Sequence, residues 1–478
     1  METGDGKRLG NPFLRNDSSS HPQFHCQYTG NTFRVPLPIE TPTWQALMQQ
    51  PPSFRDVRMS GFRDRNSVAE AWEWIDSQSS SFPQVSETVP LSSAYGRWAA
   101  TTITSPINVP PFDRSAMDGF AVIADDTTGA TNFQPTTMRI VGHSYPGTPC
   151  TISLKSGECV QIMTGAPIPE GADAVVPIEY VDVSSDRIRV TTTVGPMKNI
   201  GRIGEDLKVG DAVIQQGQFL RPQDVAVLAS IGAPEVSVLL PPRVRIIVTG
   251  NELVQPGTDL PDHQIYEANS FLLRGAVTRD GGQIESIQFV ADDPQSIRAA
   301  LEQSGADIIL ISGGSSVGAE DYAPQLVADL GELPIHGIRM RPSSPTGMGR
   351  IESTVIFLLP GNPVSCMCAY DFFAGRFLRK LCNDTRDWPF PATIGELAKK
   401  VSSPLGRTDY CRAQLRGNQI HPLAISGASI LSSTTRADGF FIIPEESEGF
   451  SSGTRVPIYI YDDRRSPQRV SNPQPDIV

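Results

Sequence analysis

Acidic side chains follow three apolar segments of the chain, and their type suggests the handling of a cation and a phosphate. Glu252 comes just after the apolar run 244–250, Asp292 follows 284–290, and Asp321 comes after 306–312. Carboxylates that crowd one edge repel each other unless a cation joins them. Mg²⁺ binds carboxylates and bridges them to phosphate oxygens. We therefore predict that these three acids are metal ligands and catalytic groups.

A glycine-rich stretch, "SGGSSVG" at 312–318, lies between the third apolar run and Asp321. Without Cβ atoms, glycines let backbone N–H groups approach an anion closely, and the N-terminus of a following helix adds a positive dipole end. The residues predicted to bind the ligand here are Gly313, Gly314, Ser315, Ser316 and Gly318. The stretch has neither Walker A nor dinucleotide-binding spacing. A tight strand–helix turn without a ligand is the equally weighted alternative.

Strand and helix patterns alternate where these residues occur. Apolar runs typical of buried strands lie at 244–250, 284–290, 306–312 and 354–360. Helical patterns follow them at 269–279, 293–304 and 364–381, the second with Asp293 as its N-cap. This alternation predicts a parallel, three-layered α/β domain, whose ligands bind outside the carboxyl ends of the strands. The fourth strand end, in "LLPGNPVS", adds to the predicted site Gly361, Asn362 and Ser365.

A second region, N-terminal to this one, predicts helices and short strands. "SVAE" is a capping box that begins a helix at Ser67, with Glu70 three residues later. "RPQDVAVLASIG" at 221–232 predicts another helix, ended by Gly232. Between the two, residues 107–204 show the pattern of strands and turns. A β-rich segment is therefore expected as an insertion between two pieces of a helical region.

The predicted fold class is a multi-domain combination of α/β and β domains. We expect a disordered leader at 1–60, a linker domain in two pieces (61–106 and 205–242), an inserted β-rich domain (107–204), the α/β domain (243–385), a C-terminal β domain (386–463) and a disordered tail (464–478). Both ends are polar and contain proline, which is typical of disorder. Translation from Met59 is a further hypothesis, which mass spectrometry of the native N-terminus would test.

Composition and charge exclude several classes of protein. The chain has 478 residues, 39% hydrophobic and 19% charged, as expected for several soluble domains. Its net charge of −12 argues against nucleic-acid binding as the main activity, and no apolar run is long enough to span a membrane. Seven scattered cysteines fit reduced thiols better than a disulfide framework. We expect a cytoplasmic protein that acts on a small molecule.

Three further stretches place polar groups outside the α/β region. They are "PPFDRSAMDGFAV" (110–122) with Asp118, "MTGAPIPEGADAVVP" (163–177) with Thr164, and "GRIGEDLKVGD" (201–211) with Asp206. In the first, we expect a structural role for Asp113 and expect Gly119 to let the chain turn beside Asp118. Each stretch alone is explained as an ordinary turn of a β domain. Only the combination of all three with the acids of the α/β region indicates a shared site.

Together with "VTGNEL", "SGGSSVGAEDY" and "LLPGNPVS", these stretches closely resemble, in order and spacing, the molybdopterin molybdenumtransferase family. These are the MoeA-type enzymes, to which the gephyrin E domain is similar, and the resemblance covers about residues 62–465. It implies a molybdopterin-binding α/β domain and a C-terminal domain resembling a β-barrel. It also implies an elongated homodimer, whose active cleft lies between the α/β domain of one subunit and the inserted domain of the other.

The resemblance implies that adenylylated molybdopterin and molybdate are substrates, and that AMP and molybdenum cofactor are products, with Mg²⁺ at the nucleotide step. The family's functional positions are matched by Asp118, Thr164, Asp206, Glu252, Asp292 and Asp321, with a serine of the last domain matched by Ser432 or Ser433. The protein partners implied are the adenylyltransferase and the apoproteins of molybdenum enzymes. A molybdopterin adenylyltransferase and a non-catalytic molybdopterin carrier or scaffold are the alternatives.

The stretch "GIRMRPSSPTGMG" (337–349) departs from the family pattern. The family often carries lysines here, whereas this chain has Gly337, Arg341 and Ser344 at the corresponding positions. We predict that Arg339 and Arg341 supply the positive charge instead. Arginine grips phosphate or molybdate as a planar fork rather than as a point charge, so the exchange alters the contacts to the anion.

Overall fold

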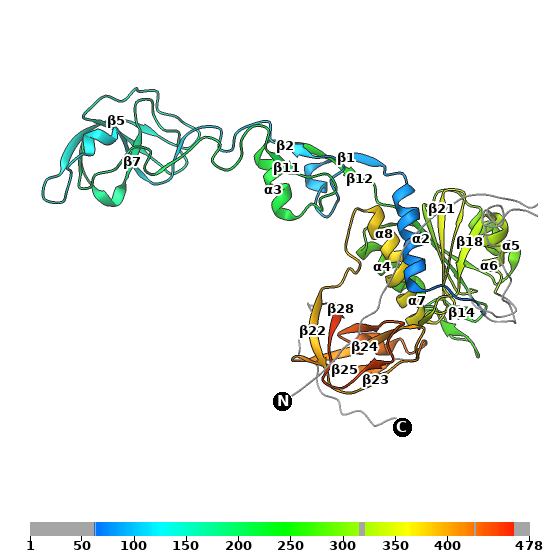
Figure 1. The fold of residues 1–478 in the computed structure, drawn as a ribbon. Coiled ribbons are helices and arrows are strands. Elements are labelled where there is room, and N and C mark those ends of the chain that lie inside the picture. The colour runs from blue at the N-terminus through cyan, green and yellow to red at the C-terminus, as the bar shows by residue number, and fades with distance from the viewer. Residues whose placement is uncertain (1–61, 63, 315–320, 425–426, 463–478) are drawn as a thin grey trace, which may run out of the picture. The chain divides into compact units, whose positions relative to one another are not determined.

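The computed structural model describes residues 62, 64–314, 321–424 and 427–462 (Figure 1). The expected disorder of 1–60 and 464–478, and the predicted ligands Ser315, Ser316 and Gly318, lie outside the described residues. In the described part of the chain, no helix has the length and apolar character needed to cross a membrane. The six cysteines that the structure describes are all free thiols.

A six-stranded sheet of order β16-β13-β17-β21-β20-β18 forms the centre of the α/β region. Its first four strands pair in parallel, which confirms the prediction: β16 (Gln283–Val290), β13 (Arg243–Thr249), β17 (Ile308–Ser312) and β21 (Thr354–Leu359). β20 (Gly347–Ile351) and β18 (Glu332–His336) extend the sheet in antiparallel pairing. The sequence pattern does not predict either strand, because β20 carries two glycines and β18 contains Pro334. A Cβ on Gly349 would lie 2.2 Å from the Glu332 carbonyl oxygen, so glycine permits this pairing.

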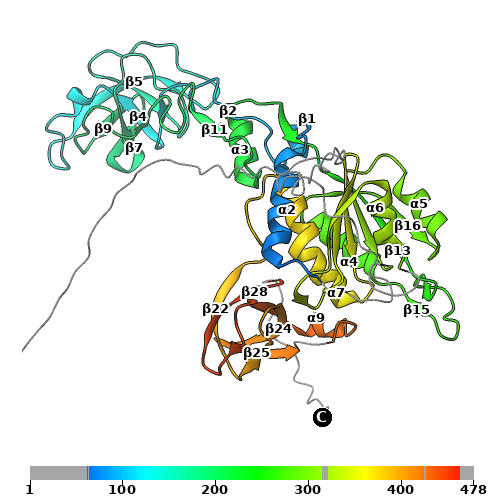
Figure 2. The same cartoon turned by 45° about the vertical axis from the view of Figure 1, so that its right-hand side comes forward.

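Helices cover both faces of this sheet, as the alternation predicts (Figure 2). β13 divides its side chains between two cores, because Val244, Ile246 and Val248 enter one and Ile247 the other. The first core includes α4 (Asn269–Arg279), α7 (Pro363–Ala369) and α8 (Gly375–Leu381), and the second includes α5 (Pro294–Leu301) and α6 (Ala323–Leu330). α4 has the predicted bounds. A π-helical turn, Tyr370–Ala374, joins α7 to α8 within the single helix that the sequence predicted.

The first helix, α2 (Val68–Ser81), begins with the predicted capping box. The Ser67 hydroxyl accepts a hydrogen bond from the Glu70 N–H, and the Glu70 carboxylate accepts one from the Ser67 N–H. Its buried face, Ala71 and Ile75, belongs to the first core of the α/β region. The linker core is separate and joins both sequence pieces through β1 (Ser86–Pro90), β12 (Glu235–Leu239) and α3 (Pro222–Ser230).

The C-terminal strands close into a barrel. The ring runs through β24 (Thr408–Arg416), β25 (Gln419–Ala424), β22 (Ala392–Leu397), β28 (Arg455–Ile460) and β26 (Gly439–Ile443), and β26 pairs back with β24. Closure removes the open edges that would invite further pairing. β19 (Met340–Arg341), from the chain between β18 and β20, pairs with β24 outside the ring. The predicted barrel-like domain is confirmed by this ring.

The inserted β region is a sheet of order β7-β4-β6-β5-β9-β8. Its strands are β4 (Gly119–Val122), β5 (Thr136–Ser144), β6 (Glu158–Ile162), β7 (Ala174–Pro177), β8 (Val181–Ser184) and β9 (Arg187–Val190). The expected turn at Gly119 is wrong, because Gly119 begins β4 and does not have a positive φ. A Cβ there would lie 2.0 Å from the Val176 carbonyl oxygen. Glycine is therefore required by the close approach of β7, and the chain does not turn at this residue.

Candidate functional site

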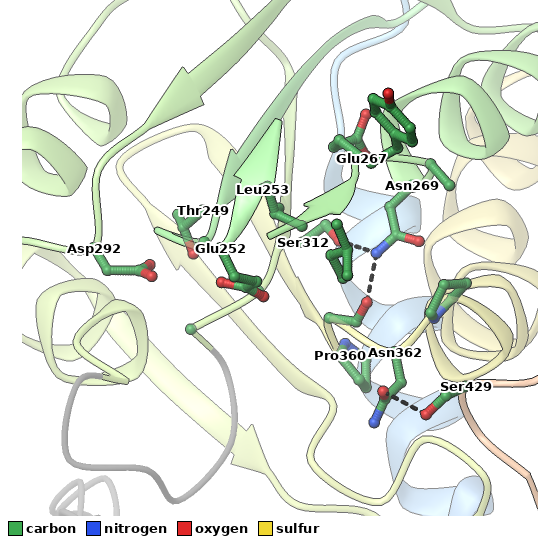
Figure 3. Close-up of a pocket in the computed structure, with 18 of the residues that line it drawn as sticks. Thr249, Glu252, Leu253, Glu267, Asn269, Asp292, Ser312, Pro360, Asn362 and Ser429 are labelled. Atoms are coloured by element: carbon green, nitrogen blue, oxygen red, sulfur yellow. Dashed lines mark hydrogen bonds between the residues drawn. The ribbon is translucent and has the colours of Figure 1, made fainter. Parts of the chain in front are cut away.

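A pocket of about 880 Å³ opens at the carboxyl ends of the parallel strands (Figure 3). Each parallel strand leads into a loop that lines it: Glu252 follows β13, Asp292 follows β16, Gly313 follows β17 and Gly361 follows β21. Asp321, just before α6, lines the same pocket. The structure therefore brings together the three predicted acids, the described part of the glycine stretch and two residues of the fourth loop, Gly361 and Asn362.

The carboxyl groups of Glu252 and Asp292 lie on the side of the pocket opposite Asn269 (Figure 3). Asp292 accepts a hydrogen bond of 3.1 Å from the Asn251 N–H through Oδ2. Its other oxygen, Oδ1, is buried, as is Thr249 Oγ1, and neither has a hydrogen-bond partner among the described residues. Within the described ranges, no group of three or more acidic, histidine or cysteine side chains is arranged to hold a metal ion by itself.

The glycines after β17 are required by the backbone. Gly313 and Gly314 have φ angles of 102° and 57°, which favour glycine. A Cβ on Gly313 would also lie 2.3 Å from the Thr249 carbonyl oxygen. The tight-turn interpretation therefore accounts for these two glycines, and the same turn exposes their backbone to the pocket. The tight turn and the predicted binding of an anion by this backbone are therefore compatible.

Asn269, at the start of α4, was not singled out from the sequence although it organises the floor of the pocket. Its amide donates to Ser312 Oγ (2.8 Å) and to the Gly361 carbonyl oxygen (2.7 Å), as Figure 3 shows. Only 7% of its surface is exposed. The neighbouring Glu267 accepts hydrogen bonds from the N–H and hydroxyl of Ser270. A buried asparagine in a helical pattern gives no local signal, because its partners are distant in sequence.

The predicted basic residues and serines lie elsewhere. Arg341 is paired with the buried Asp409 at 2.8 Å, and Arg339 lies 3.5 Å from Glu445. The lining of the pocket includes none of Arg339, Arg341, Ser365 and Ser432. Ser429 reaches it instead, because its hydroxyl donates to Asn362 Oδ1 at 2.8 Å. Proximity in space, which the sequence does not reveal, distinguishes Ser429 from the exposed Ser432.

In the inserted region, Asp118 and Thr164 are partners. Asp118 Oδ1 accepts hydrogen bonds from the Thr164 N–H (2.7 Å) and hydroxyl (2.9 Å). These bonds, the backbone one first, lower the pKa of the exposed Asp118 carboxyl. The carboxylate is thus held ionised and fixed in direction while it remains open to solvent.

Asp206 is exposed in a turn whose N–H donates to the Val109 carbonyl oxygen. Asp113 accepts a hydrogen bond of 2.7 Å from the Ile203 N–H, which agrees with the structural role expected for it. Its neighbour Arg114 lies 3.4 Å from Glu205. The stretch before Asp118 and the turn that carries Asp206 are therefore tied together.

The chain is a multi-domain protein that combines a parallel α/β domain with an acid-lined pocket, a closed C-terminal barrel and an inserted β sheet. Residues 66–232 match the family described as MoeA N-terminal region (domain I and II). Residues 245–380 match the family described as probable molybdopterin binding domain. Residues 395–461 match MoeA C-terminal region (domain IV).

Relatives along most of the chain lead to the same assignment. The sequence is 34% identical to molybdopterin molybdenumtransferase 2 of Mycobacterium tuberculosis over 382 residues, 78% of this chain and 94% of that protein. It is 33% identical to molybdopterin molybdenumtransferase of Haemophilus influenzae over 386 residues, 79% and 94% of the two chains. The crystal structure of the molybdopterin biosynthesis MoeA protein of Pyrococcus horikoshii is similar with a TM-score of 0.72 and 31% identity, over 83% of this chain and all of that one. The chain belongs to the MoeA family of molybdopterin molybdenumtransferases.

Proposed function

We propose that this protein is a molybdopterin molybdenumtransferase, which inserts molybdate into adenylylated molybdopterin and releases AMP. The observation that carries the proposal is the pocket of Figure 3, where loops from four parallel strands gather acids and glycines. Family membership supplies the substrate class, since relatives over most of the chain bear this name. In the nucleotide step, water attacks the phosphoanhydride link between the adenylate and the pterin phosphate, one P–O bond forms as another breaks, and AMP leaves.

The pocket residues suit positioning and electrostatic stabilisation, which supply most of the rate in phosphoryl transfer. The backbone at Gly313 and Gly314 would hold the pterin phosphate, with the rest of the stretch, Ser315, Ser316 and Gly318, as the proposed remainder of the cradle. Asn269 orients the Gly361 carbonyl and Ser312, and thereby fixes the two loops that frame the phosphate. Arg339, Arg341 and Ser432 remain proposals for contacts to the anion or to molybdate.

Mg²⁺ fits the oxygen ligands of this pocket. One or two of the predicted ligands Glu252, Asp292 and Asp321 would hold it at a time. The buried, unpartnered Asp292 Oδ1 and Thr249 Oγ1 are oxygens without another role in the described structure. Mg²⁺ commonly takes only one or two carboxylates and completes its shell with water and phosphate oxygens. The lack of a three-residue ligand cluster among the described residues is therefore compatible with it. When bound, the ion would neutralise charge on the phosphates.

The inserted region would complete the site from a second subunit of a homodimer. Asp118 and Thr164 of this region are proposed to contribute there, together with Asp206, which lies just after it in the second linker piece. Four large apolar side chains close to them in sequence are 42–50% exposed: Phe112, Met117, Met163 and Ile203. Exposed apolar groups beside polar ones are typical of an interaction surface. We also propose a cytoplasmic location, the domain boundaries given above, and contacts with the adenylyltransferase and with molybdenum-enzyme apoproteins.

The proposal is tested by incubating the purified protein with adenylylated molybdopterin, molybdate and Mg²⁺, and measuring AMP. AMP release that requires molybdate is expected. An adenylyltransferase would instead make adenylylated molybdopterin from ATP, and a carrier would bind it without releasing AMP, so either result would overturn the proposal.

Two adjacent acids provide a matched pair of variants. Asp292→Asn should raise the Mg²⁺ concentration needed for half-maximal AMP release, because it removes a ligand charge. Asp293 caps α5, accepting from the Ser296 N–H at 2.9 Å, and is not among the lining residues. Asp293→Ala should lower stability by about 1 kcal/mol and leave the Mg²⁺ dependence unchanged. Equal Mg²⁺ dependence in both variants would remove Asp292 from the proposed metal site.

A further inference from the structure

The start of the described chain lies against the segment that departs from the family pattern. Asn66 forms a parallel bridge with Ile338. The Asn66 N–H donates to the Gly337 carbonyl oxygen at 3.0 Å, and the Asn66 carbonyl oxygen accepts from the Arg339 N–H at 2.8 Å. The side chain of Arg339 donates to the Arg65 carbonyl oxygen at 2.8 Å. Residues 65 and 66 therefore hold the backbone of 337–339 on one side.

The held backbone is one leg of a closed loop, 337–346. The Gly337 N–H donates to the Thr346 carbonyl oxygen (2.9 Å), and the Ile338 N–H donates to the Ser344 carbonyl oxygen (2.8 Å). Within the loop, Ser343 Oγ donates to the Ser365 carbonyl oxygen, at the start of the helix that follows the fourth strand end. Pro345 lines the pocket. A displacement of the leg would therefore be transmitted to the wall of the pocket.

Phe62 occupies the space that a side chain at position 337 would need. Gly337 has a φ of 93°, and a Cβ built on it would lie 2.5 Å from Phe62 Cδ1. The ring also packs edge-on against His336, with centroids 4.9 Å apart, and the Arg65 guanidinium lies 5.7 Å from its centre. Phe62 and Gly337 thus fit each other: the ring packs closely because position 337 carries no side chain.

We propose that Phe62 and Asn66 are positioning residues, which hold loop 337–346 and so set the wall of the pocket and the direction of Arg339 for an anionic substrate. The proposal rests on the function proposed above. The contacts of Phe62 predict that its removal loosens the backbone of 337–339. The contacts within the loop predict that the loop stays folded but shifts. Binding of the anion should suffer more than the rate of the chemical step.

The first experiment measures hydrogen exchange, which does not depend on any activity. Phe62→Ala should speed exchange of the Ile338 and Arg339 amides by about tenfold or more. Phe62→Tyr, which keeps the ring, should restore protection. Phe82→Ala is the matched control, because Phe82 makes a similar edge contact with Phe377, with centroids 6.0 Å apart, just beyond the far end of α2. Unchanged exchange in Phe62→Ala, or equal acceleration in Phe82→Ala, would overturn the proposal.

The second experiment separates binding from turnover in the AMP-release assay. Phe62→Ala should raise KM for molybdate or for the adenylylated substrate by about tenfold with a smaller change in kcat. Gly337→Ala should act in the same direction, and the double variant should fall short of the product of the two effects, because the clash disappears with the ring. Faster exchange with unchanged KM would reject the positioning role. Inactive wild-type protein would reject the proposed function, while exchange would still decide whether Phe62 holds the loop.

Discussion

Asn269 joins three elements at the floor of the pocket through one amide group. Its two donated hydrogen bonds connect the start of α4, the end of β17 and the loop after β21. The sequence predicts the two strand ends and the helix start but not the residue that connects them. At the residue scale, the arrangement of the pocket loops depends on a single side chain that fixes the direction of a backbone carbonyl and a hydroxyl.

Asn269→Ala should lower the free energy of unfolding by about 1–3 kcal/mol, because the Gly361 carbonyl and the Ser312 hydroxyl would lose a buried partner. Denaturant unfolding measures the loss. We also expect weaker substrate binding, since the two loops would no longer be held together. Wild-type stability in this variant would show that other groups replace the amide.

Thr164→Val should raise the pKa of Asp118 without returning it to the usual range. The substitution removes the hydroxyl bond but keeps the stronger contribution of the Thr164 N–H. Because the pKa is lowered, Asp118 stays ionised at neutral pH and loses these hydrogen bonds only on acidification below its ordinary range. NMR titration of the carboxyl carbon measures the change. An unaltered pKa would mean that the hydroxyl bond contributes nothing in solution.

The helix that follows the fourth strand is shaped by buried charge. Asp280 lies 2.8 Å from Arg279 and 3.2 Å from Arg379, and Asp371 of the π-helical turn is 2.8 Å from Arg279. A buried ion pair is costly unless its geometry is well satisfied. At the element scale, this cluster explains why α8 begins with Gly375, which makes room for it.

Gly375→Ala should destabilise the protein by about 1–3 kcal/mol, although alanine has a higher helix propensity than glycine. The new Cβ would lie 2.8 Å from Asp280 Oδ2 and 3.0 Å from an Arg379 nitrogen. Gly275→Ala in α4 is the matched control, because nothing lies within 4 Å of its Cβ, and it should stabilise by up to about 1 kcal/mol. Thermal unfolding of both variants compares them, and stabilisation by both would contradict the clash.

The whole molecule distributes its proposed site between two regions of the chain. The pocket at the sheet contains Glu252, Asp292 and Asp321. Asp118 and Thr164 belong to the inserted region, and Asp206 lies just after it, at the start of the second linker piece. The two sets would meet if a second copy of the chain completes the site, as we propose. If two subunits share the site, two inactive variants should restore activity when they are mixed, whereas a site formed within one chain would not allow this.

Mixing the purified Asp118→Ala variant with the purified Glu252→Ala variant should restore AMP release. Each variant alone should be inactive, but a mixed dimer would contain one intact site, formed by the unaltered halves of both subunits. Random exchange of subunits at equal amounts predicts about a quarter of the wild-type activity. Light scattering must show dimers in each preparation. No recovery after proven exchange would indicate that each site is formed within one chain.

Local patterns were sufficient for much of the fold. The capping box at Ser67, the N-cap at Asp293 and the bounds of α4 were all foreseen, because each depends on neighbours in sequence. The antiparallel strands β18 and β20 are not evident from the sequence, since Pro334 weakens the strand pattern of β18 and two glycines weaken that of β20. The sequence favours a turn at Gly119 because it does not show that β7 approaches this residue.

The same division applies to the site. Residue types and strand ends were enough to predict that Glu252, Asp292, Gly313 and Asn362 would meet, because parallel strands bring their carboxyl ends to one edge. The contacts of Asn269 and Ser429 with that edge, the pairing of Arg341 with Asp409 and the fit of Phe62 against Gly337 required the tertiary structure. These contacts join residues between 43 and 275 positions apart. Only the folding of the chain brings residues so far apart in sequence into contact, whereas helical caps and strand ends depend on adjacent residues.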